Sequence, residues 1–321
     1  MALDQELISH IEDSMKAVGK IAENESALIV SMKKQRRLLK NSHLNLFVLT
    51  HKNFRELSSL IKKLIKLPIN YKFQFVVKLY GDDNELGHWA SGEFTWAYDK
   101  NDLKLFLYDS VGLEHSKNIL LKMLSGGFDF VNISNCVNFQ VFLGADKVQY
   151  AEFGCSYLAL DTAFMISNQD NYDNYDNLYE SIIDNENMDP VINRLISNFI
   201  IMSDAKNLNI YSVNLPLRLL RMKQSYSNLE PILNNDSLAN KVVTRRGKTF
   251  KESVSDKITE VNGKKINSRN EFLREKSLKY FKIFKQNIKN PELLSKEIED
   301  NKIDGLRADI SKLTIDIVNK I

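Results

Sequence analysis

Cysteine is scarce in this chain. Its 321 residues include only Cys136 and Cys155, which do not form the C-x-x-C spacing of a zinc site. The sequence therefore offers neither a disulfide framework nor a zinc knuckle, and it suits a reducing compartment. Long apolar runs are also missing, because no stretch approaches the roughly 18 residues of a membrane-spanning helix. We expect no membrane span.

The N-terminus lacks the basic and then apolar pattern of a cleaved secretory signal, and it reads MALDQELISHIEDSMK. If the protein leaves its cell, we expect export without a cleaved signal. The chain is long enough to bury a substantial core, because 43% of its residues are hydrophobic. One large domain or two interleaved smaller ones fit this length.

Charge is unevenly distributed, although the formal net charge is only +3. Residues 241–289 hold fifteen Lys or Arg against five Asp or Glu, and KKQRRLLK at 33–40 is a second basic run. Residues 170–189 hold seven acids and no base. Such runs are commonly solvated helix faces. The alternative is an anion site, where cations from separate segments converge.

Hydrophobic spacing alternates between helix-like and strand-like periods, which predicts an α+β fold. The predicted helices cover residues 4–21, 25–40, 53–67, 115–125, 155–167, 190–208, 269–288 and 291–321. The predicted strands cover residues 44–50, 71–80 and 137–143, two further strands within 88–112, and short strands within 241–268. The polar segment 168–190 lacks the central glycine of an EF-hand, so we expect an exposed loop and no metal site.

Four residue types that a cysteine nucleophile needs occur in one order. They are His88 at the start of a strand, Asp109 at the end of the next, Gln149 in a loop and Cys155 at a helix start. A helix N-terminus favours the thiolate, and the imidazole takes and returns a proton while the carboxylate holds its tautomer. Gln149 and the backbone N–H of Cys155 would donate to an oxyanion, and Gly154 admits an acyl group close to the backbone.

Each of these residues alone has an ordinary structural explanation. A buried cysteine is commonly inert packing, and an aspartate after a strand commonly forms a turn. The conjunction of four residues at two tight spacings favours a site. Cys136 precedes a strand without such partners, so we interpret it as structural, and nothing in the sequence near His115 suggests a base.

The segments GHW, LYDS and QYAEFGCSYLAL resemble the clan of cysteine enzymes that includes the ubiquitin-like-protein proteases and the YopJ family of bacterial effectors. The YopJ family is the closer match, because the similarity continues through residues 215–233, 241–250 and 261–284 in the order of its regulatory region. It spans about residues 5–285. It implies a cysteine-protease-like core, in which helices flank a mixed sheet, interleaved with a regulatory region of helices and short strands.

The resemblance implies a ping-pong acetyltransferase that uses acetyl-CoA, modifies Ser/Thr and sometimes Lys, and is switched on by inositol hexakisphosphate. By position, Cys155 is the nucleophile, His88 the base and Gln149 the oxyanion donor. Asp109 orients the base, but YopJ proteins carry glutamate there, and Trp89 is more typical of the proteases. These departures leave a deubiquitinase or ubiquitin-like-protein protease as the alternative.

For the polyphosphate activator, the family draws cations from its N-terminal helix and its regulatory region, and Arg suits phosphate geometrically. The matching residues here are Arg36, Arg37, Arg218, Arg221, Lys223, Arg274 and Lys276. Met222 stands where the YopJ family has a histidine, so one phosphate donor is missing.

We expect four parts in the chain. They are an N-terminal helical part of the regulatory region (1–40), a catalytic domain (41–205), a basic regulatory region (206–288) and a C-terminal amphipathic helix (289–321). The resemblance implies action in the host cytoplasm on host proteins such as kinases, with a small polyphosphate and no nucleic acid as further partner. A polyphosphate- or nucleic-acid-binding module that uses the basic C-terminal half is the non-enzyme alternative.

Overall fold

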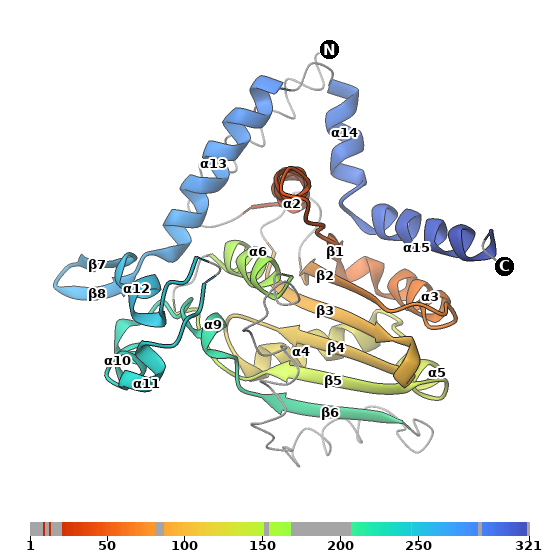
Figure 1. Cartoon of the computed structure of the whole chain (residues 1–321), viewed down its shortest axis with the longest axis horizontal. Coiled ribbons are helices and arrows are strands. Elements are labelled where there is room, and N and C mark those ends of the chain that lie inside the picture. Colours follow the sequence, from red (N-terminus) through yellow and green to blue (C-terminus); the bar gives the residue numbers. More distant parts are fainter. Residues whose placement is uncertain are drawn as a thin grey trace.

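The computed structural model describes residues 9, 13, 21–80, 87–150, 154–167, 207–244, 246–287 and 291–319. Within them, one six-stranded sheet has the strand order β1-β2-β3-β4-β5-β6, and helices cover both of its faces (Figure 1). Its strands are β1 (Leu46–Thr50), β2 (Tyr71–Lys78), β3 (Trp89–Ala97), β4 (Asp102–Tyr108), β5 (Asn138–Gly144) and β6 (Leu208–Val213). The predicted α+β fold with a mixed sheet is confirmed.

The direction of the strands brings distant segments to one edge of the sheet. The pairs β2–β3 and β3–β4 are antiparallel, whereas β1–β2, β4–β5 and β5–β6 are parallel. Ser91 lies opposite Tyr108, so the start of β3 and the end of β4 meet at the same edge. Because β5 runs parallel to β4, the loop that follows β5 also leaves the sheet there.

Both faces of the sheet are buried, which explains the nearly continuous apolar runs of its strands. On one face, Phe47 and Leu49 of β1 pack with helices α3 (Phe54–Leu64), α4 (Leu113–Ser125), α5 (Phe130–Ser134) and α15 (Ile303–Val318). On the other face, Leu46 and Val48 pack with α2 (Glu23–Leu38), α6 (Cys155–Ile166), α13 (Arg269–Asn287) and α14 (Pro291–Glu299). Helix α2 lies above the sheet and contacts both α13 and α14 (Figure 1).

The segment between β6 and α13 forms a small layer beside the sheet. Its elements are α9 (Leu217–Leu220), η5 (Tyr226–Asn228), α10 (Glu230–Leu233), α11 (Asp236–Ala239), α12 (Phe250–Ser255) and the hairpin of β7 (Ile258–Val261) with β8 (Lys264–Asn267). Leu229, Val243, Phe250 and Val254 give it a separate apolar cluster. The short strands predicted here are confirmed. Of the helices that the structure describes, none has the length and apolar character to cross a membrane.

Two predicted helices were wrong in part. The single helix predicted over 291–321 is divided, because α14 ends at Glu299 and α15 begins at Ile303. Between the two helices, the carbonyl oxygen of Asn301 accepts a 2.8 Å hydrogen bond from Val48 N. This bond gives a partner to a backbone N–H on the open side of the edge strand β1.

The helix predicted over 190–208 ends incorrectly, because Leu208 begins strand β6. Parallel pairing with β5 decides the conformation of this segment, and spacing within the segment alone did not reveal it. Strand β6 follows residue 205, the expected end of the catalytic segment, yet it belongs to the same sheet. The predicted loop 168–190 and most of the helix predicted over 4–21 fall outside the described residues.

Candidate active site

The edge of the sheet where β3 starts and β4 ends carries the predicted catalytic residues. His88 directly precedes β3, and Asp109 directly follows β4. Gln149 lies in the loop after β5, and Cys155 is the first residue of α6. Strand direction alone therefore collects side chains that lie up to 67 positions apart in the sequence.

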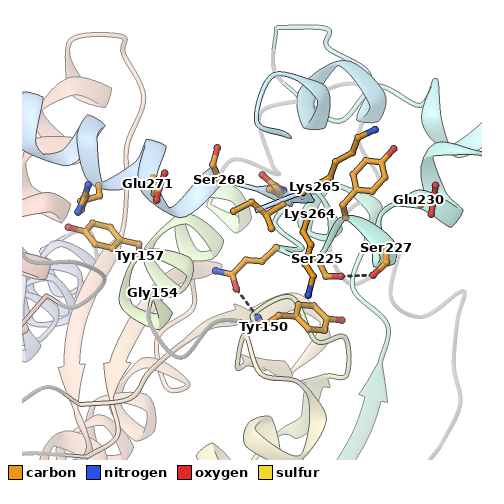
Figure 2. A pocket seen from close by; sticks show the side chains of 16 residues that line it. Tyr150, Gly154, Tyr157, Ser225, Ser227, Glu230, Lys264, Lys265, Ser268 and Glu271 are labelled. Carbon is orange, nitrogen blue, oxygen red and sulfur yellow. Dashed lines mark hydrogen bonds between the residues drawn. The ribbon is translucent and has the colours of Figure 1, made fainter. Parts of the chain in front are cut away.

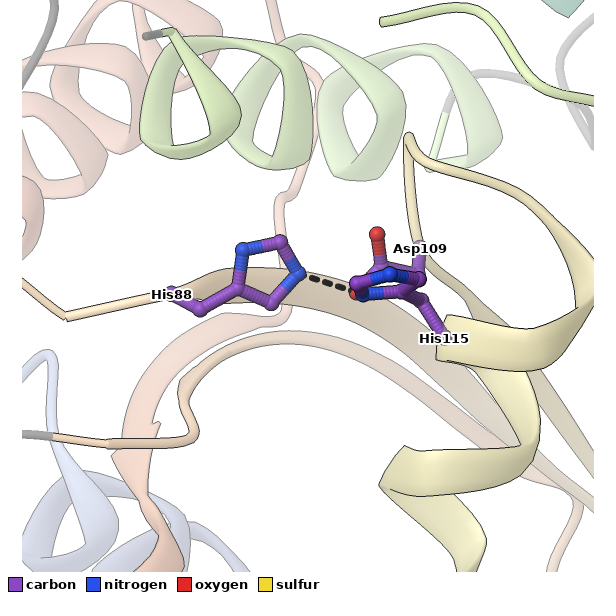
Figure 3. A group of neighbouring side chains, drawn as sticks. All are labelled: His88, Asp109 and His115. Carbon is purple, nitrogen blue, oxygen red and sulfur yellow. Dashed lines mark hydrogen bonds and ion pairs between the residues drawn. The ribbon is translucent and has the colours of Figure 1, made fainter. Parts of the chain in front are cut away.

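His88 and Asp109 form the centre of this cluster. The Nε2–H of His88 donates to Oδ2 of Asp109 (Figure 3). Asp109 has no solvent exposure, and its second oxygen, Oδ1, accepts a 2.9 Å hydrogen bond from Val111 N. The backbone N–H of Asp109 is held by Ser116 Oγ at 3.1 Å, and Ser116 in turn donates to the carbonyl of Gly144 at 2.8 Å. Asp109 is thus held through its carboxylate by His88 and Val111 N, and through its backbone by Ser116 of α4.

Charge compensation makes the His88 imidazole unusually basic. Burial favours its neutral form, but the hydrogen bonds and negative charges of Asp109 and Cys155 outweigh burial and raise the pKa of His88 to about 10. Because Nε2 is bonded to Asp109, Nδ1 is the ring nitrogen left for the sulfur of Cys155. This arrangement places a basic imidazole beside the sulfur, as a cysteine nucleophile requires.

Cys155 takes its position from the helix start. Gly154 precedes it at φ 108°, a left-handed conformation that glycine adopts without strain. Cys155 is 8% exposed, and its Sγ lies 3.9 Å from the carbonyl oxygen of Gly87, next to His88. The positive end of the twelve-residue helix α6 therefore faces the sulfur.

Gln149 is oriented by a neighbour that sequence reasoning did not single out. Ser110 Oγ donates to the amide oxygen of Gln149 at 2.6 Å, and the carbonyl of Ser110 accepts from Gln149 N at 2.8 Å. Gln149 is only 5% exposed. Because its oxygen is engaged, the amide presents its NH₂ group as the donor side. Ser110 follows Asp109 directly, and that adjacency was the available signal.

His115 is the second residue that sequence reasoning missed. It stands on the first turn of α4, and its ring centroid lies 5.5 Å from that of His88, at an interplanar angle of 57°. Gly112 turns the chain back immediately after Asp109, which returns His115 to the carboxylate (Figure 3). The short spacing of six residues between Asp109 and His115 could have indicated this contact.

A cavity of about 1030 Å³ opens beside the N-terminus of α6 (Figure 2). Gly154 and Tyr157 form its floor on the side of the cysteine, and the β7–β8 hairpin and α13 form the opposite wall. The remaining lining includes Tyr150, Gln224, Ser225, Tyr226, Ser227, Glu230, Lys264, Lys265, Ser268, Glu271 and Arg274. Aromatic rings and cations together suit a ligand with both an apolar part and phosphates.

A second cluster, here called the Asp161 basic cluster, surrounds the middle of α6. Asp161 accepts two hydrogen bonds from Arg269, at 2.7 and 2.5 Å. Burial of Asp161 opposes its ionisation, but the charges of Arg269, Arg221 and Lys276 prevail and lower its pKa. The other cations of this cluster are Lys33, Arg36 and Arg246.

Repulsion remains among these cations. Burial first, and then the charges of Lys276, Arg37 and Arg36, lower the pKa of Lys33 to about 8, although Asp161 opposes the shift. The pKa of Lys276 is also lowered, by burial and by Arg36, Arg269 and Arg246 against the attraction of Asp161. The attraction of Asp161 therefore offsets only part of the shift that burial and the neighbouring cations impose on Lys33 and Lys276.

The seven predicted activator residues do not all converge. Arg36, Arg221 and Lys276 belong to the Asp161 basic cluster. Arg37 also faces it, but its guanidinium donates to Ser167 Oγ at 2.7 Å and to the carbonyl of Phe164 at 3.2 Å.

The other predicted activator residues lie apart. Lys223 pairs with Asp146 at 3.3 Å, and Arg274 lines the cavity. Arg218 is buried on α9. Sequence reasoning missed Lys33 on α2, Arg246 between α11 and α12, and Arg269 on α13, which distant segments of the chain bring together.

The chain matches a family model described as YopJ serine/threonine acetyltransferase over residues 5–304. Among curated proteins, none matches the chain.

Solved structures show the same fold. AvrA delL154 with IP6 and CoA aligns with a TM-score of 0.53 and 13% identity, and the match covers 87% of this chain and 97% of that one. HopZ1a in complex with IP6 aligns with a TM-score of 0.53 and 11% identity, and the match covers 87% of this chain and 93% of that one. HopZ1a in complex with IP6 and CoA aligns with a TM-score of 0.50 and 10% identity, with 87% and 97% covered.

Proposed function

The chain belongs to the YopJ family of serine/threonine acetyltransferases, and from this premise we propose that it acetylates Ser or Thr hydroxyls of proteins through Cys155. The observation that carries the proposal is the meeting of His88, Asp109 and Cys155 at the start of α6. A thiolate held beside an imidazolium at a helix N-terminus is the nucleophile that acyl transfer needs.

In the first half-reaction, His88 accepts the thiol proton and the Cys155 sulfur attacks the acetyl carbonyl of acetyl-CoA. The amide of Gln149 and the N–H of Cys155 stabilise the oxyanion, and each such donor contributes roughly 3 kcal/mol. The thioester bond to CoA then breaks, and the departing thiolate takes the proton from His88. The products of this step are free CoA and S-acetyl-Cys155.

In the second half-reaction, His88 removes the proton of a substrate hydroxyl, and the oxygen attacks the acetyl group on Cys155. The bond to Cys155 breaks, the sulfur leaves as the thiolate, and the acetyl ester is released. Asp109 keeps Nε2 of His88 protonated throughout, so Nδ1 is the atom that exchanges protons. Lys acceptors would react by the same route.

We assign acetyl-CoA to the cavity of about 1030 Å³, since it borders Gly154 and Tyr157 on the helix that begins with Cys155. Lys264, Lys265 and Arg274 on its wall are suited to the phosphates. We assign inositol hexakisphosphate to the Asp161 basic cluster, where its negative charge would offset the burial and the cationic repulsion that lower the pKa of Lys33. AvrA and HopZ1a have been solved with IP6 and CoA, which supports both assignments.

The division into a catalytic part and a basic regulatory part, and the action on host proteins in the host cytoplasm after export without a cleaved signal, belong to the same proposal. They rest on the YopJ resemblance and on the basic composition of residues 241–289.

Intact mass spectrometry tests the proposed reaction. With acetyl-CoA and inositol hexakisphosphate, the protein is expected to gain an acetyl group that hydroxylamine removes, and a host extract is expected to become labelled from radioactive acetyl-CoA. Cys155→Ala abolishes both signals, whereas Cys136→Ala, which removes the exposed cysteine, leaves them intact. Labelling that survives in Cys155→Ala would refute the mechanism.

One specific observation favours the protease alternative. Asp109 stands where YopJ proteins carry glutamate, and Trp89 follows His88 as in the proteases. It requires Cys155 to react with ubiquitin or ubiquitin-like propargyl probes. Adduct formation with such a probe, combined with no acetylation, would move the assignment to an isopeptidase.

A further inference from the structure

The neighbourhood of His88 contains a third ligand type besides an acid and a base. One nitrogen of His88, one oxygen of Asp109 and one nitrogen of His115 all lie within 4.8 Å of one another (Figure 3). Two imidazoles and one carboxylate form the protein ligand set of many zinc and other first-row metal sites. We propose that this cluster binds Zn²⁺ reversibly and that the bound ion switches Cys155 off.

The geometry needs only a small adjustment. Zinc holds nitrogen and oxygen ligands at roughly 2.0–2.2 Å, so two ligands of a tetrahedral site lie about 3.4 Å apart. The three atoms lie within 4.8 Å of one another, so a movement of the His115 side chain by at most about 1.4 Å would bring its nitrogen to that distance. His88 and Asp109 are closer than this, and they would separate as the ion enters.

The solvent exposure of the two imidazoles and the negative charge of Asp109 are both compatible with a bound cation. The side chain of His88 is 20% exposed and His115 is half-buried, so both imidazoles reach solvent. Asp109 is fully buried and supplies the negative charge that a divalent cation needs in such surroundings. The imidazole of His115 has no hydrogen-bond partner among the described residues, so it gives up no protein contact to become a ligand.

The ion would take the place of one proton. In the metal-free protein a proton joins His88 Nε2 to Asp109 Oδ2. Zn²⁺ binding releases that proton to solvent and places Nε2, the carboxylate oxygen and the His115 nitrogen on the metal. His88 is then no longer oriented by Asp109 as a base for Cys155. The fourth position stays open to water or to the sulfur of Cys155, which already faces His88.

Metal binding does not depend on the proposed acetyl transfer, and its test uses two readouts that need no acetyl-CoA. The full-length protein carries Cys136→Ser, which removes an exposed thiol that could bind metal. Calorimetry with Zn²⁺ measures affinity, and Co²⁺ reports geometry through its visible absorption. A sulfur-to-cobalt band in the near ultraviolet would place Cys155 at the fourth position.

We expect one tightly bound Zn²⁺ per chain, a tetrahedral Co²⁺ spectrum, and slower alkylation of Cys155 by iodoacetamide in the presence of Zn²⁺. His115→Ala is expected to weaken Zn²⁺ binding by at least about 100-fold, since loss of a direct ligand exceeds the 10–100-fold cost of an outer-shell change. His43→Ala, which removes an exposed histidine elsewhere, is the matched control and leaves affinity unchanged. Equal Zn²⁺ affinity in His115→Ala and the parent protein, or an octahedral Co²⁺ spectrum in the parent, would overturn the proposal.

Discussion

Helix α6 carries two charged clusters that balance their charges differently. At its first residue, Cys155, burial lowers the pKa of His88, but the hydrogen bonds and charges of Asp109 and the sulfur outweigh burial and raise it to about 10. About 9 Å further along the helix, Asp161 lies among cations. Burial, and then the charges of the neighbouring cations, lower the pKa of Lys33 there to about 8. At His88 the neighbouring charges are of opposite sign and raise its pKa, whereas at Lys33 most of the neighbouring charges are of like sign and add to the lowering by burial.

Under the proposed function, this difference would separate a preorganised reaction centre from a site that binds a ligand. A compensated cluster holds its geometry without outside help, as catalysis requires. A polyanion bound beside cations that repel one another lowers their electrostatic free energy. Because α6 joins the two, the polyanion would stabilise the helix on which Cys155 stands.

The largest expected effect comes from breaking the compensation at the first cluster. Asp109→Asn should lower kcat for acetyl transfer by about 10⁴-fold, because the amide favours the wrong tautomer of His88. The pKa of His88 should fall towards its ordinary 6.5, which NMR of the imidazole would measure. Asp129→Asn, at the surface pair with Lys62, is the matched control with full activity.

The same substitution changes the pH dependence of stability. The raised pKa of His88 belongs to the folded state, so protonation stabilises the fold fully below pH 6.5 and this contribution is lost as pH rises through about 10. Urea unfolding across this range should show the loss in the parent protein and not in Asp109→Asn. Parallel curves for the two proteins would contradict the pairing.

A smaller effect should follow from removing the oxyanion donor. Gln149→Ala is expected to reduce kcat by about 10²–10³-fold with little change in the KM for acetyl-CoA. Ser110→Ala should lower kcat less, because it frees the amide of Gln149 to rotate without removing it. An equal loss in both variants would show that the orientation of the amide, and not only its presence, controls the rate.

The second cluster should lose ligand affinity when its cations are removed. Arg221→Ala combined with Lys276→Ala is expected to weaken inositol hexakisphosphate binding by at least about 100-fold, at roughly 1.5 kcal/mol per charge-assisted hydrogen bond. Calorimetry would measure it. Lys241→Ala combined with Lys251→Ala removes two exposed bases of the same region and serves as the control. Equal losses in both double variants would assign the binding to general charge.

The smallest expected effect is a pH dependence of that affinity. A bound polyanion favours the protonated form of Lys33 and so raises its pKa above about 8. Binding therefore takes up protons, and affinity should fall by a few fold as pH rises through that value. Calorimetry in buffers of different ionisation enthalpy would detect the uptake, and Lys33→Met should reduce it. No change in proton uptake in this variant would exclude Lys33 from the site.

The predicted catalytic residues His88, Asp109 and Cys155 lie together in the structure, whereas the predicted activator residues converge only in part. Local patterns mark strand ends and helix starts well. His88 lies just before a strand, Asp109 just after one, Gln149 in the loop after a strand, and Cys155 at a helix start. Most of the predicted activator cations lie on helices. The spacing of residues along a helix does not reveal which other element its basic face will contact. Lys223 consequently pairs with Asp146 instead of joining Arg221 and Lys276.

Hydrophobic spacing of two to four residues predicted the fold class and the elements at the sheet edge, and the order of His88, Asp109, Gln149 and Cys155 predicted a cysteine nucleophile. Tertiary structure alone decided three further features. It set the break between α14 and α15, the convergence of Lys33 and Arg269 on Asp161, and the placement of His115 beside His88. The physical reason is that each depends on contacts between elements, and contact between distant segments follows from packing and strand pairing across the whole sheet.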